Sequence, residues 1–180
     1  MHLLIRRNFV ITARRSSLFV AAAAHAAVTA LYLEAWAEAG GAPVAGGANI
    51  FEQLLLVQAV FMALVAPWVG ARIVAGETRT DLVRLSIQYG VLPGTLWRSR
   101  LVTVIAWILL VQFAGVPAVI DAQQMSAVSL YSAAGAQLAL LCLGLAGGLL
   151  SCATAARIDL DLIRWLLPAA TVLLILTAAV

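Results

Sequence analysis

The chain has 180 residues, of which 64% are hydrophobic and 11% are charged, and its formal net charge is +3. Soluble domains carry roughly a quarter charged residues, so most of this chain must face lipid or other apolar helices. All eleven basic residues are arginines. The absence of lysine excludes a Walker-type phosphate-binding loop and Schiff-base chemistry, because both need a lysine amine.

Five segments are apolar and long enough to cross a bilayer, which takes about 20 residues. The predicted spans cover residues 17–36, 50–74, 101–120, 127–155 and 162–180. The connection between the third and fourth spans, around Asp121, Gln123 and Gln124, is predicted to be a short turn. We therefore predict an all-α, polytopic membrane helix bundle that forms a single transmembrane domain over residues 1–180.

The arginines alternate with the predicted spans. They occur before the first span, between the second and third, and between the fourth and fifth, at Arg6, Arg7, Arg14, Arg15, Arg72, Arg79, Arg84, Arg98, Arg100, Arg157 and Arg164. Basic residues near membrane spans stay in the cytoplasm, so the N-terminus is predicted to be cytoplasmic and the protein a multi-pass protein of a bacterial-type inner membrane. The positive charge is expected to meet anionic lipid headgroups, and no nucleic acid is expected as a partner because basic and aromatic residues are not interleaved.

The N-terminal segment, residues 1–16, mixes four arginines with apolar residues. The favoured interpretation is a helix that lies in the inner membrane interface, where both kinds of side chain are accommodated. The alternative is a basic tail that only sets the topology.

Residues 77–89 form the most informative connection. Read as a helix, this segment places Glu77, Asp81, Arg84 and Gln88 in one stripe beside an apolar stripe of Leu82, Leu85 and Tyr89. Thr78 or Thr80 would cap its start, and Gly90 with Pro93 would end it. Such a helix is too short and too charged to cross the membrane. It either lies along the cytoplasmic surface or, as we favour, docks against a soluble partner.

The predicted spans hold few polar groups. Every carboxylate falls near a predicted span end, which argues against ion-coupled transport, and only His25, Gln58 and Gln137 bring strong polarity to mid-depth. A hydrogen bond between helices is the favoured role for His25, with titration or substrate binding as the alternative. No catalytic, metal or cofactor set is expected, because no Ser/His/Asp or Cys/His set occurs at matching depths.

Two further features concern helix packing. Gly144 and Gly148 form a GxxxG spacing in the fourth span, which predicts close packing of two helices. Pro67 is expected to kink the second span.

The second half of the second predicted span and the segment after it resemble the corresponding part of a known family. Residues 64–77, Leu-Val-Ala-Pro-Trp-Val-Gly-Ala-Arg-Ile-Val-Ala-Gly-Glu, are similar to the type-2 ABC transporter permeases, and the match continues through Thr80, Asp81, Leu82, Leu85, Pro93 and Arg100. The resemblance implies that residues 77–89 are a coupling helix, with Glu77, Asp81, Leu82, Arg84, Leu85, Gln88 and Tyr89 docking on a separate nucleotide-binding ATPase subunit. ATP and Mg²⁺ would then bind to that partner and not to this chain.

The resemblance also implies a permease subunit that pairs with a second permease, identical or not, and has no enzymatic activity of its own. Two departures stand out: Arg79 replaces the family's usual Gly, and the sequence ends after the fifth predicted span, where the family adds an external hairpin and a sixth span. The departures leave a rival hypothesis, a non-transporting subunit that scaffolds a larger membrane complex. A small secondary transporter ranks last because mid-span carboxylates are missing.

Overall fold

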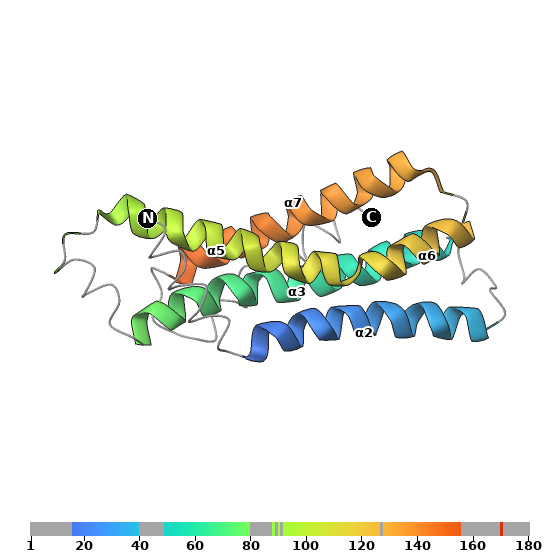
Figure 1. The fold of residues 1–180 in the computed structure, drawn as a ribbon, viewed down its shortest axis with the longest axis horizontal. Coiled ribbons are helices and arrows are strands. Elements are labelled where there is room, and N and C mark those ends of the chain that lie inside the picture. Colours follow the sequence, from blue (N-terminus) through green and yellow to red (C-terminus); the bar gives the residue numbers. More distant parts are fainter. Residues whose placement is uncertain are drawn as a thin grey trace.

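A computed structural model describes residues 16–39, 49–79, 88, 90, 92–126, 128–155 and 170. All the secondary-structure elements within these ranges are helices. The five helices are α2 (Ser16–Glu38), α3 (Ile50–Arg79), α5 (Pro93–Ala114), α6 (Val116–Ser126) and α7 (Leu130–Ala155). α2, α3 and the α5–α6 pair run roughly along one common direction (Figure 1), and α2 packs against both α3 and α5. All but the last residue of the predicted interfacial helix (residues 1–16) and most of the predicted fifth span (162–180) lie outside the described residues.

Four of these helices are long and apolar enough to cross a membrane, over Ser17–Glu38, Ile50–Val74, Gly94–Ala114 and Leu130–Ala155. Helices cover the first, second and fourth predicted spans to within a few residues at either end. Within the described part of the chain the architecture is thus an all-helical bundle with four candidate spans, as expected for a multi-pass membrane protein.

The third predicted span is wrong in its bounds. Its helix begins at Pro93, is interrupted at Gly115 and continues as α6 to Ser126. The predicted turn around Asp121 is therefore helical. A helix persists there because α6 buries Ala118, Val119 and Ala122 against the start of α3, while Asp121 and Gln124 face outward. One apolar face is enough to hold a polar helix on the bundle.

The boundary after the second span also differs from the prediction. A new helix was expected to begin at Glu77, but α3 continues through Glu77 and Thr78 to Arg79. Thr78 therefore does not cap the start of a helix. Further along, Gly90 adopts a left-handed φ of +67°, the conformation that favours glycine at a helix end, and Pro93 opens α5.

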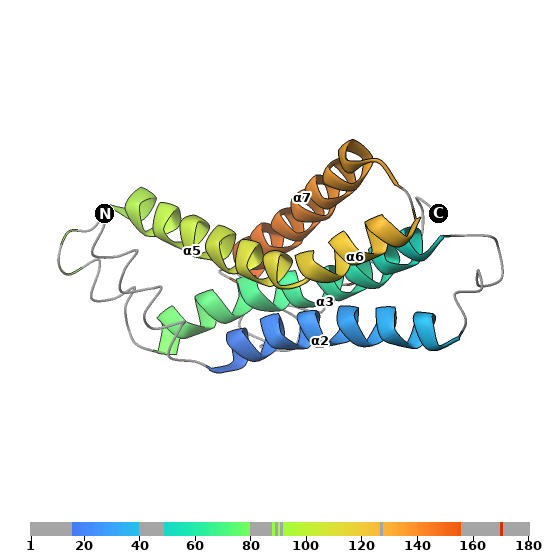
Figure 2. The ribbon, with the colours of Figure 1, turned by 45° about the vertical axis from the view of Figure 1, so that its right-hand side comes forward.

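The main core lies between α2, α3, α5 and α7 around Trp107, which is fully buried. Its ring makes an edge-to-face contact with Phe19 at a centroid distance of 5.1 Å. A second cluster joins the start of α3 to α6. Near its Leu130 end, α7 slopes away from the other helices (Figure 2). Large apolar side chains remain exposed on all five helices, as lipid-facing residues would be.

Candidate functional site

Polar side chains from four helices meet near the point where α5 gives way to α6. His25 of α2, Gln58 of α3, Gln112 of α5 and Gln137 of α7 form what we call the polar cluster. His25, Gln58 and Gln112 are buried, with His25 and Gln58 fully so. In lipid a buried polar group must find its partner inside the protein, so these contacts tie the helices together at one level.

The break between α5 and α6 leaves the backbone carbonyl of Val111 without its helical donor. The N–H of Gly115 donates to the oxygen of Gln112, three residues back, at 3.1 Å, instead of to the oxygen of Val111 as in a regular α-helix. His25 replaces the missing donor: its Nδ1 lies 2.7 Å from the Val111 oxygen. The His25 ring is held flat against Phe61, with centroids 4.7 Å apart. The expected hydrogen bond of His25 between helices is confirmed.

The glutamines form a second connection to the same break. The Nε2 of Gln58 donates to the carbonyl of Gly115 at 3.5 Å, and the Nε2 of Gln137 donates to Oε1 of Gln58 at 2.9 Å. Gln112 in turn donates from Nε2 to Oε1 of Gln137. The series of hydrogen bonds therefore starts at Gly115 and ends at Gln112, three residues earlier in the chain.

Gly115 is the residue that lets these groups converge. A Cβ placed on it would lie 2.7 Å from Cε1 of His25 and 2.7 Å from Nε2 of Gln58. Sequence reasoning found His25, Gln58 and Gln137 but missed Gln112 and Gly115. The available signal was Gly-Val-Pro inside a predicted span, since Pro117 has no N–H to continue the helical hydrogen bonds.

The predicted packing residues lie along α3 and α7. A Cβ on Gly144 would lie 2.6 Å from Cε of Met62, and one on Gly148 would lie 2.6 Å from Cδ1 of Ile108. On the α3 side, Gly70 faces the backbone of Gly148. Pro67 is buried within α3, which continues through it as a helix.

Little of the predicted docking segment is described. Glu77 belongs to the last turn of α3, and Gln88 is helical and exposed. The remaining predicted docking residues lie outside the described part of the chain: Asp81, Leu82, Arg84, Leu85 and Tyr89. Two residues before Val74, where the second candidate span ends, the guanidinium of Arg72 lies 5.5 Å from the ring centroid of Trp68. Such a cation–π contact is typical of a membrane interface.

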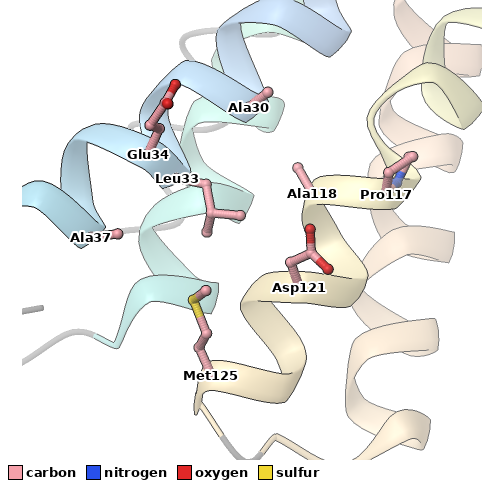
Figure 3. Close-up of a pocket in the computed structure, with 8 residues that line it drawn as sticks. All are labelled: Ala30, Leu33, Glu34, Ala37, Pro117, Ala118, Asp121 and Met125. Atoms are coloured by element: carbon pink, nitrogen blue, oxygen red, sulfur yellow. The ribbon is translucent and has the colours of Figure 1, made fainter.

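A groove of about 340 Å³ separates α2 from α6 at the opposite end of the bundle. Leu33 of α2 and Met125 of α6 point into it, and Glu34 and Asp121 lie at its borders (Figure 3). Neither carboxylate has a further acidic, His or Cys neighbour that would complete a metal site among the described residues. The groove thus offers a mainly apolar surface with two acidic borders.

Comparisons with models of protein families, with curated proteins and with solved structures found no match.

Proposed function

We propose that this protein is the membrane-spanning permease subunit of an ATP-driven exporter, in which a separate subunit hydrolyses ATP. The observation that carries the proposal is the continuity of α3. Its 30 residues span about 45 Å, whereas the hydrocarbon core of a bilayer is about 30 Å thick. One helix therefore leads from the polar cluster, through Gln58, to the arginine-bearing end of the bundle at Arg79.

A helix of this kind can transmit force if it is held rigidly. α3 packs more extensively against α7 than any other two helices of the bundle pack against each other. The contact is close because Gly70 and Gly148 bring the two backbones together. Movement of the segment after Arg79 would then displace α3 and α7 as one unit relative to α2. Residues 77–89 are proposed to bind the ATPase, with Leu82 and Leu85 as apolar anchors and Glu77, Asp81 and Arg84 as complementary charges.

The experiment compares two leucine substitutions in the tagged full-length protein, purified in mild detergent with its companions. Leu85→Asp is expected to abolish co-purification of a subunit that carries a Walker-type ATPase motif. Leu92→Asp is the matched control, because Leu92 is 72% exposed just before α5. Binding of that subunit to Leu85→Asp at the wild-type level, with helicity intact, would refute the docking assignment.

The rival function, a scaffolding subunit of a larger membrane complex, is favoured by one observation. The polar side chains inside the bundle bind each other and the backbone, as structural groups do. The same purification separates the two hypotheses. Stable companions without any ATPase would support scaffolding, whereas an ATPase whose retention depends on Leu85 would support export.

A further inference from the structure

The polar cluster contains two buried acceptors that the described residues do not satisfy, Nε2 of His25 and Oε1 of Gln112. An unpaired buried acceptor costs about 1–3 kcal/mol, and apolar surroundings raise that cost. Such groups in a native membrane protein call for an explanation, because almost all buried polar groups have a partner.

The identity of both atoms as acceptors follows from the helix break. A backbone carbonyl only accepts hydrogen bonds, so the carbonyl of Val111 requires the proton of His25 on Nδ1. In the neutral ring Nε2 is then a lone pair. The carbonyl of Gly115 also accepts the N–H of Val119, and because it can only accept, the nitrogen end of the Gln58 amide faces it at 3.5 Å. The oxygen of Gln58 then faces Gln137.

The same requirement passes along the glutamines. Gln137 must turn its nitrogen to Gln58 and its oxygen to Gln112, so Gln112 donates from its nitrogen and keeps Oε1 unpaired. A flip of any one amide would set two oxygens or two nitrogens against each other. The carbonyls of Val111 and Gly115 thus orient every polar side chain in the cluster. The hydrogen bonds that start at Val111 leave Nε2 of His25 as a free acceptor, and those that start at Gly115 leave Oε1 of Gln112 as a free acceptor.

We propose that the α5–α6 break is a binding site for a small neutral molecule that donates hydrogen bonds, with His25 Nε2 and Gln112 Oε1 as its acceptors. The two sources of such a donor are water and the hydroxyl group of an amphiphile dissolved in the bilayer. An anion is disfavoured because both unsatisfied atoms of the cluster are acceptors. Gly115 lets the His25 ring and the Gln58 amide lie directly against the break, since a Cβ there would crowd both. The inference concerns the interior of the bundle and does not depend on an ATPase partner.

The chain has only two histidines, His2 and His25, which makes the site accessible to spectroscopy. The full chain with His2→Ala, labelled with ¹⁵N-histidine and reconstituted in phosphatidylcholine bilayers, gives a single imidazole in solid-state NMR. We expect the Nδ1–H tautomer, an unprotonated Nε2 that accepts a hydrogen bond, and magnetisation transfer to Nε2 from water. A protonated Nε2, or an unprotonated Nε2 that accepts no hydrogen bond, would overturn the proposal.

A pair of isomeric probes identifies the source of the donor. n-Butanol and diethyl ether have the same formula, but only the alcohol donates a hydrogen bond. Replacement of the water transfer by transfer from butanol, without an effect of ether, assigns the site to bilayer-soluble hydroxyl groups. Water transfer that survives both probes assigns it to a resident water. An equal loss of the water transfer with butanol and with ether would reveal a bilayer effect and reject a donor-specific site.

The second acceptor is tested with Gln112→Leu in the same background. If butanol is bound, its apparent affinity is expected to fall about fivefold, the loss of one neutral hydrogen bond; if water is bound, its transfer to Nε2 is expected to weaken. Phe113→Leu, at an exposed neighbouring position, is expected to have no effect. The Nδ1–H signal reports whether the break itself is intact in either variant. An unchanged response of Gln112→Leu with that signal intact would remove Gln112 from the site.

Discussion

Gly70 of α3 meets Gly148 of α7 backbone to backbone: a Cβ built on Gly70 would lie 2.1 Å from the carbonyl oxygen of Gly148. No side chain fits in that space, and the obstacle is a backbone atom that cannot turn aside. Where lipid supplies no hydrophobic drive between helices, such close packing is a main source of their association. The two longest described helices are thereby joined near the arginine-bearing end of the bundle.

Gly70→Ala is expected to destabilise the bundle by about 1–3 kcal/mol, because α3 and α7 must separate to admit the methyl group. The free energy of unfolding, measured by SDS titration in mixed micelles, checks this. Gly135→Ala is the control, since a Cβ at Gly135 on α7 would have nothing within 4 Å. An equal effect of the two substitutions would show that helix propensity, and not the close contact, governs the result.

The hydrogen bond between Gln58 and Gln137 is expected to couple α3 to α7. Gln58→Leu leaves the amide nitrogen of Gln137 without its acceptor and removes one of the two donors to the carbonyl of Gly115, which keeps the N–H of Val119. The two single substitutions together should therefore cost more than the double substitution. Interhelical hydrogen bonds in membranes are worth about 0.6 kcal/mol on average. A double-mutant cycle of Gln58→Leu and Gln137→Leu, measured by the same titration, should give a coupling energy of that size. Strict additivity would contradict the bond.

Gly115→Ala is expected to push His25 and Gln58 away from the break, with a loss of about 1–3 kcal/mol in the free energy of unfolding. The ¹⁵N signal of His25 should also show that Nδ1–H no longer donates a hydrogen bond to Val111. Gly94→Ala, in the first turn of α5, has open space around the added methyl and should leave both measurements unchanged. A wild-type His25 signal in Gly115→Ala would contradict the crowding.

The arrangement of arginines predicts opposite sides of the membrane for the first two connections. In a Cys142→Ala, Cys152→Ala background, Gly46→Cys is expected to react with an impermeant maleimide added to intact cells. Leu85→Cys is expected to react only after the cells are opened. Labelling of position 85 from outside would reverse the predicted topology and remove the proposed ATPase contact with it.

The positions of three spans could be read from the residues because a run of about 20 apolar side chains has few alternatives to a membrane helix. The same reasoning failed at the third span. Asp121, Gln123 and Gln124 suggested a turn, and no local pattern shows that Ala118 and Ala122 are buried against α3. Whether α3 ends at Glu77 was equally undecided locally, since Glu77 and Thr78 suit both a helix start and a helix interior.

Helix type, span positions and the expected orientation thus come from hydrophobicity and charge, which act residue by residue along the chain. The polar cluster comes from the fold. His25 and Val111 are 86 residues apart and Gln58 and Gly115 are 57 apart, so only the packing of α2 and α3 on the broken helix makes them partners. A hydrogen bond depends on the distance and the angle between donor and acceptor, and a local sequence pattern specifies neither for residues so far apart in the chain.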